Sequence, residues 1–125
     1  MVQKLFLLIL AGALGTLSRY GLAGVVQRIM GSEFPWGTLA VNLVGCLFAG
    51  IFWSLAEIRL SISGQARIII LIGFMGAFTT FSAFVLETAQ MMRDAQWLWA
   101  MTNVFIQNAC GIALFFVGVG VGRHI

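Results

Sequence analysis

Charged residues are scarce in this 125-residue chain, since Asp, Glu, Lys and Arg make up 9% of it and hydrophobic residues 61%. A soluble domain of this length carries far more charge on its surface, so the composition excludes a soluble globular protein. Cysteine occurs only twice, too few for a disulfide-stabilised secreted mini-protein. The sequence therefore predicts an all-α integral membrane protein with a single domain over residues 1–125.

The groups that enzymes and pumps need are also missing. The sequence contains no nucleotide-phosphate loop, no nucleophile–base pair and no pair of carboxylates inside an apolar segment. We therefore expect neither an enzyme nor a pump, and no nucleic-acid partner. Glycine, by contrast, occurs 15 times against a single proline. This favours close contact between spanning helices over disorder, because small residues let helix backbones approach one another.

Charged positions divide the chain into four apolar segments, each long enough for a spanning helix of about 20 residues. The first segment runs from Leu5 to Val26 and is interrupted only by Arg19. The other three lie between charged residues: Glu33 and Glu57, Arg67 and Glu87, Asp94 and Arg123. Short polar connections at residues 31–35 and 61–65 predict that consecutive helices are antiparallel neighbours.

Basic residues near the span ends give a weak orientation signal. Four fall on the side of both termini, against two on the other side: Lys4, Arg59, Arg67 and Arg123, against Arg28 and Arg93. So small an imbalance allows insertion in either direction. The chain also has too little interior for a transport path of its own, so we expect a homo-oligomer. An antiparallel pair fits both observations, and a single orientation with cytoplasmic termini is the alternative.

Residues 73–84, GFMGAFTTFSAF, place polar groups in the middle of the third span. Gly73 and Gly76 weaken a helix, and hydroxyl groups can bind backbone atoms that a break frees. Three hydroxyls follow the glycines: Thr79, Thr80 and Ser82. One hypothesis is a broken helix, with free carbonyls suited to a cation and free N–H groups suited to an anion. The alternative is a continuous helix with a small-residue packing face.

Aromatic and amide side chains in the spans allow two interpretations each. Phe81 and Phe84 share one side of a helix that begins near Thr79, where they either pack or turn positive ring edges toward a small anion. The Asn42 amide in the second span offers two donors, which can face an anion or bond a neighbouring helix. Asn103 and Gln107 are four residues apart and so share a face, as a polar helix contact or a wet groove.

Taken together, these motifs resemble the Fluc (CrcB-type) fluoride channels over the whole chain. The resemblance is carried by the length, the four spans and three segments in order: residues 15–20 (GTLSRY), 37–45 (GTLAVNLVG) and 73–84. It implies an antiparallel, dual-topology homodimer in the bacterial inner membrane, with two pores and a central structural sodium ion. It also implies a function, the passive export of cytoplasmic fluoride for detoxification.

The same resemblance assigns roles to individual residues. The backbone carbonyls of Gly76 and Thr79 correspond to the sodium ligands. The residues corresponding to the fluoride pore are Asn42, Thr80, Phe81, Ser82, Phe84, Glu87, Asn103 and Gln107, of which those in the fourth span match least closely. Arg19 corresponds to a family arginine, either in an anion-attracting vestibule or as an anchor.

One position departs from the family pattern. The usual order is Thr-Thr-Phe-Ser-Thr-Phe, whereas this chain has Ala83 in place of the third threonine. If that missing hydroxyl holds fluoride or orders the pore, conduction should be reduced without loss of the fold, because alanine keeps the helix intact.

Two rival functions were weighed against a fluoride channel. A small multidrug-resistance-type, proton-coupled transporter needs a carboxylate at mid-membrane, but the first span has none and Glu87 lies near a span end. A non-transporting membrane assembly subunit leaves the Thr-Phe-Ser cluster of residues 79–84 unexplained.

Overall fold

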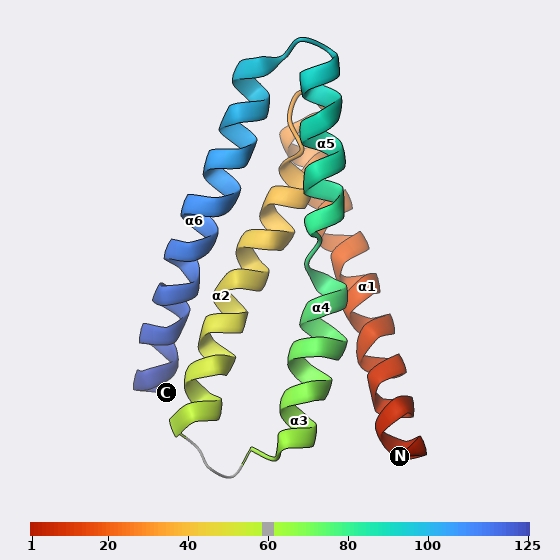
Figure 1. The fold of residues 1–125 in the computed structure, drawn as a ribbon, viewed down its shortest axis with the longest axis vertical. Coiled ribbons are helices and arrows are strands. Elements are labelled where there is room, and N and C mark those ends of the chain that lie inside the picture. Colours follow the sequence, from red (N-terminus) through yellow and green to blue (C-terminus); the bar gives the residue numbers. More distant parts are fainter. Residues whose placement is uncertain (59–61) are drawn as a thin grey trace.

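The computed structural model describes residues 1–58 and 62–125, and every regular element in them is helical (Figure 1). The elements are α1 (Val2–Met30), α2 (Trp36–Ile58), α3 (Gly64–Ile68), the π-helix η1 (Ile69–Met75), α4 (Gly76–Phe78), α5 (Phe81–Arg93) and α6 (Trp97–His124). Four stretches of the described chain are long and apolar enough to cross a membrane: α1, α2, Gly64–Arg93 and α6. The four predicted spans are confirmed in this sense, whereas Arg59 and Ser61, used above for the charge balance and the second connection, lie outside the described residues.

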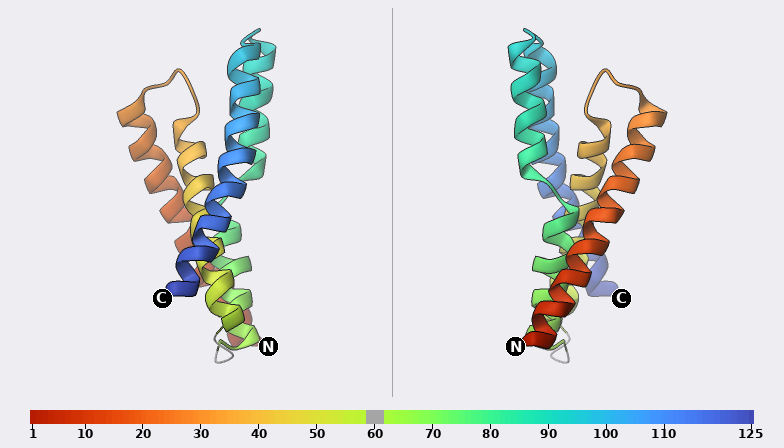
Figure 2. Two further views of the ribbon diagram at one scale, coloured as in Figure 1. Left: turned by 90° about the vertical axis from the view of Figure 1, so that its left-hand side faces the viewer. Right: turned by 90° about the vertical axis from the view of Figure 1, so that its right-hand side faces the viewer.

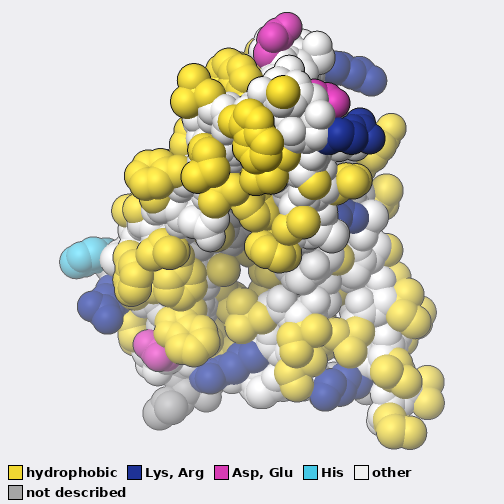
Figure 3. Space-filling view, turned by 45° about the horizontal axis from the view of Figure 1, so that its top comes forward, with side chains coloured by type: hydrophobic (Ala, Val, Ile, Leu, Met, Phe, Trp, Pro, Cys, Tyr) yellow, Lys and Arg dark blue, Asp and Glu magenta, His cyan; other side chains and the backbone are white. Residues whose placement is uncertain are grey.

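Both termini lie at one end of the bundle, and the α1–α2 and α5–α6 connections lie at the other (Figure 1). Seen from the side, α1 and α2 diverge from α5 and α6 toward that second end (Figure 2). Hydrophobic side chains spread over much of the surface visible in Figure 3. This is the surface expected of helices that lie in hydrocarbon.

Helices α2 and α6 are in close backbone contact in their C-terminal halves. A Cβ atom on Gly50 of α2 would lie 2.0 Å from the Phe115 carbonyl oxygen of α6. A Cβ atom on Gly118 of α6 would lie 2.2 Å from the Leu47 carbonyl oxygen of α2. Only glycine fits at either position, so these two helices form a rigid base for the site.

The third span changes its neighbour halfway along. Its first part packs on α1, where a Cβ on Gly15 would lie 2.4 Å from the Phe74 carbonyl oxygen. Its second part, α5, packs on α6. Gly73 belongs to the α1 contact, since a Cβ there would lie 2.9 Å from the Cβ of Ala11. The predicted discontinuity is confirmed, and it lies at Thr79 and Thr80.

Candidate functional site

The break in the third span diverts two backbone hydrogen bonds onto side chains. Thr79 and Thr80 are extended, with φ/ψ of −83°/159° and −149°/106°. In a continuous helix, the Thr80 N–H would donate to the Gly76 carbonyl and the Ala83 N–H to the Thr79 carbonyl. Instead, the Thr80 N–H donates to Asn42 Oδ1 (2.8 Å) and the Ala83 N–H to Thr80 Oγ1 (3.2 Å). The carbonyls of Gly76 and Thr79 therefore lose their helical donors.

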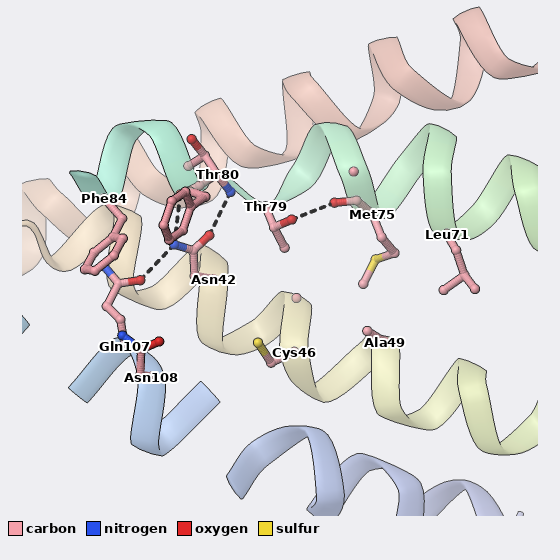
Figure 4. Close-up of a pocket in the computed structure, with 13 residues that line it drawn as sticks. Asn42, Cys46, Ala49, Leu71, Met75, Thr79, Thr80, Phe84, Gln107 and Asn108 are labelled. Carbon is pink, nitrogen blue, oxygen red and sulfur yellow. Dashed lines mark hydrogen bonds between the residues drawn. The ribbon is translucent and has the colours of Figure 1, made fainter. Parts of the chain in front are cut away.

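These two carbonyls belong to the residues that the sequence assigned to a cation. Gly76 and Thr79 both line a cavity of about 410 Å³, shown in Figure 4. Gly76 is exposed among the described residues. Backbone carbonyls without a helical donor can replace the hydration shell of a monovalent cation. The chemistry of this donor set therefore fits a monovalent cation such as sodium.

Asn42 bridges the break to α6. Its Oδ1 accepts from the Thr80 N–H at 2.8 Å, and its Nδ2 donates to the Thr80 carbonyl at 3.1 Å. The same Nδ2 donates to Gln107 Oε1 at 2.8 Å. Figure 4 shows the Asn42 amide between Thr80 and Gln107. Asn42 thus bonds neighbouring helices, which is one of its two sequence interpretations, and it also lines the cavity.

From Gln107 the hydrogen bonds continue in one direction. Gln107 Nε2 donates to Asn103 Oδ1 (3.2 Å), and Asn103 Nδ2 donates to Thr88 Oγ1 (3.0 Å). Thr88 Oγ1 then donates to the Phe84 carbonyl in α5 (2.7 Å). We call this series, from Asn42 to the Phe84 carbonyl, the amide relay. Asn103 is 0% exposed and holds Gln107 through this hydrogen bond, whereas Gln107 lines the cavity.

The two predicted pore phenylalanines lie together on α5. The ring centroids of Phe81 and Phe84 are 5.5 Å apart and the rings are inclined by 52°. Both rings line the cavity, yet Phe84 is buried (8% exposed) and Phe81 is 74% exposed. Ser82 is exposed, and its Oγ lies 3.4 Å from Thr80 Oγ1. The Phe81 ring and the Ser82 hydroxyl are therefore both exposed near the middle of the third span.

Glu87 lies apart from the break. Its Oε1 accepts from the Thr38 hydroxyl at 2.6 Å, and its buried Oε2 has no hydrogen-bond partner among the described residues. Glu87 lines a separate cavity of about 410 Å³, which also contains Glu33 and Asp94. Because Thr38 is close to the start of α2, this carboxylate lies near the end of the bundle that holds the α1–α2 connection.

Arg19 and Ala83 share another cavity, of about 290 Å³, enclosed by α1, α2 and α5. Thr80 lines this cavity as well as the one at the break. Arg19 is half-buried, and it makes no ion pair within residues 1–58 and 62–125. A threonine at position 83 would therefore add a hydroxyl to the cavity that Arg19 lines and not to the cavity that Phe81 and Phe84 line.

A family model described as CrcB-like protein, Camphor Resistance (CrcB), matches residues 6–119. The chain belongs to the CrcB family. Relatives named "Fluoride-specific ion channel FluC" are 50% identical over 125 residues in Desulforapulum autotrophicum and 51% identical over 125 residues in Nitrosococcus oceani, with 100% of both chains covered in each case. A FluC of Parabacteroides distasonis is 39% identical over 122 residues, which are 98% of this chain and 94% of the relative.

Three features of the site in this CrcB chain were not found from the sequence. Thr38 had a signal that was overlooked, since Thr38, Asn42 and Gly45 recur at the spacing of one helix face. Gly45 is the point of contact with the break, because a Cβ there would lie 2.2 Å from Thr79 Cγ2. The π-helix η1 before the break was not predicted, because Gly73 in its sequence IILIGFM indicates a weakened helix but not a π-helix.

Proposed function

We propose that this protein is a passive, fluoride-selective channel that exports cytoplasmic fluoride, and that it works as an antiparallel homodimer around a structural sodium ion. The observation that carries the fluoride function is the full-length similarity to relatives named fluoride-specific ion channels. The broken third span provides the hydrogen-bond donors that can replace the water around a fluoride ion.

A fluoride pore has to replace a tightly held hydration shell with several donors and still release the ion. The Asn42–Gln107 bond joins two side chains, so it is the bond at this site that an anion exchanges most readily. Fluoride takes the place of Gln107 Oε1 as the acceptor for Asn42 Nδ2. The ring edges of Phe81 and Phe84, which line the same cavity, provide the next favourable contacts, and the width of the path excludes chloride.

The homodimer accounts for the polar surface in the middle of the third span. Gly76, Phe81 and Ser82 are exposed there, and hydrocarbon cannot satisfy free backbone or hydroxyl groups. An inverted second copy brings its own break to the same depth, since the break lies close to halfway along Gly64–Arg93. The carbonyls of Gly76 and Thr79 from both copies would then hold the sodium ion, which supplies a fixed positive charge at the dimer centre.

The two rival functions fit the site less well. Proton-coupled multidrug transport requires a carboxylate at mid-membrane, whereas Glu87 is paired with Thr38 close to the start of α2. A purely structural subunit does not explain why the backbone N–H groups of Thr80 and Ala83 bind side chains beside a cavity.

The test is reconstitution of the purified full-length protein into liposomes, with separate recordings of fluoride, chloride and proton-coupled cation fluxes. We expect fluoride efflux without chloride efflux and without proton coupling. Absence of fluoride efflux from folded protein, in the natural chain and in Ala83→Thr, would refute the channel. The homodimer is tested separately by native mass spectrometry, and dual topology by labelling a single introduced cysteine from each side of the membrane.

A further inference from the structure

The peptide group between Thr79 and Thr80 connects the Asn42 side chain to the carbonyls of the break. The Thr80 N–H and the Thr79 carbonyl belong to this one planar group, and the described chain has no cis peptide bond. In a trans peptide, the N–H and the C=O point in opposite directions. Because Asn42 Oδ1 holds the Thr80 N–H at 2.8 Å, it also turns the Thr79 carbonyl away from Asn42.

The same hydrogen bond acts on the second carbonyl. The Thr80 N–H is the donor that a continuous helix would give to the Gly76 carbonyl. While Asn42 Oδ1 accepts it, the helix cannot close over Gly76. One acceptor atom thus sets the direction of the Thr79 carbonyl and keeps the Gly76 carbonyl free of its helical donor.

An amide is the side chain suited to this position. Asn42 Nδ2 donates to the Thr80 carbonyl at 3.1 Å, so one side chain satisfies both backbone groups of Thr80. The same nitrogen also donates to Gln107 Oε1, and an amide nitrogen carries only two hydrogens. Both donors are therefore in use, and only the bond to Gln107 can be exchanged without releasing the break.

We propose that Asn42 is the positioning residue of the cation site, acting through the Thr79–Thr80 peptide rather than as a cation ligand. It holds the break open, aims the Thr79 carbonyl and anchors both to α6 through Gln107. A change at Asn42 therefore alters sodium affinity as well as fluoride passage. This inference rests on the sodium site of the proposed function, but its first readout depends on neither sodium nor fluoride.

The test compares Asn42→Ala with Asn42→Asp, which keeps an acceptor oxygen, and with Asn108→Ala. Asn108 is a matched control, because its amide lines the same cavity but donates to Val104 of its own helix (2.7 Å). Full-length protein in detergent is first studied by hydrogen–deuterium exchange of the peptide covering residues 76–84. It is then titrated with NaCl against a background of N-methylglucamine chloride, with thermal unfolding as the readout.

Loss of a buried hydrogen bond should raise exchange in residues 76–84 by about tenfold in Asn42→Ala. The sodium concentration for half-maximal stabilisation should also rise by about tenfold. Asn42→Asp should raise exchange less than Asn42→Ala does, because it keeps the acceptor for the Thr80 N–H, and Asn108→Ala should match the natural chain in both readouts. If Asn42→Ala does not fold, Asn42→Asp takes its place: exchange over residues 76–84 should rise by less than about tenfold because the acceptor for the Thr80 N–H is kept, and a rise of about tenfold or more would overturn the inference.

Unchanged exchange in folded Asn42→Ala would overturn the positioning role, whatever sodium does. If exchange rises in Asn42→Ala but its sodium affinity is unchanged, Asn42 does not position the cation ligands and the inference is overturned. If the natural chain shows no sodium response, the sodium site of the proposed function fails and this inference fails with it. The fluoride efflux assay would still report on the channel independently.

Discussion

Adding a single methyl group at Gly45 should displace the break. Gly45 lies one turn after Asn42 on α2, and a Cβ there would lie 2.2 Å from Thr79 Cγ2. Two carbon atoms settle at about 3.5–4.0 Å, so Thr79 has to move by more than an ångström. The side chain cannot simply rotate, since Thr79 Oγ1 donates to the Met75 carbonyl at 3.0 Å. Gly45→Ala therefore forces the backbone of the break away from α2.

The expected energy follows from three opposing contributions. Overpacking a filled site costs about 1–3 kcal/mol. Loss of the Thr79–Met75 bond would add about 1 kcal/mol. Alanine in a helix interior returns about 1 kcal/mol relative to glycine. We expect a net destabilisation of about 1–3 kcal/mol. Because this cost falls on the geometry of the break, and 1.4 kcal/mol corresponds to a factor of ten, fluoride efflux should fall by about fivefold or more.

The assay is fluoride efflux from liposomes, recorded with an ion-selective electrode, alongside thermal unfolding in detergent. Gly120→Ala is the matched control, because a Cβ built at that position of α6 meets no atom within 4 Å among the described residues other than the nearby backbone of its own helix. It should be neutral or slightly stabilising. A Gly45→Ala protein with the natural efflux rate and unfolding temperature would show that the break does not depend on this contact.

Four further changes give graded outcomes. Thr80→Val removes the hydroxyl that begins α5 and should cost about 1 kcal/mol in thermal unfolding, whereas Thr80→Ser, which keeps it, should be near neutral; equal losses would contradict the capping role. Thr38→Val leaves the half-buried Glu87 without its 2.6 Å partner and should cost about 1–3 kcal/mol of unfolding free energy, so an unchanged unfolding curve would refute that role. Gly118→Ala places a carbon 2.2 Å from a backbone oxygen of α2 and should abolish monodisperse protein in size-exclusion chromatography; a normal elution profile would contradict this. Ala83→Thr adds a hydroxyl beside Arg19 and should raise fluoride efflux, and an unchanged rate would exclude a conductive role for that hydroxyl.

The spans could be predicted because their signal is local. Charge-free intervals of sufficient length mark the four helices, and glycines beside hydroxyl residues mark the discontinuity. The residue at which the helix breaks is not local information. It depends on Asn42, 38 positions away, which takes the Thr80 N–H, and on Gly45, which leaves room for Thr79. Gly73 illustrates the same limit, since its glycine serves the contact with α1 rather than the break.

Residue type alone also did not predict which polar residues are buried and which line a cavity. Asn103 and Gln107 share a helix face, yet the packing of α5 buries one completely and leaves the other on the cavity. Ala83 and Phe84 are adjacent, yet they line different cavities, because successive helical residues point about 100° apart. Such distinctions require the neighbouring helices to be in place.

The amide relay places a constraint on how this protein can vary. Each of its side chains accepts from one neighbour and donates to the next, so the series has a single sense from Asn42 to the Phe84 carbonyl. An acid in place of one amide would set two acceptors against each other, and turning one amide over would require all of them to turn. Substitutions in the relay should therefore be strongly epistatic: a change that is harmful alone should be tolerated only together with a matching second change.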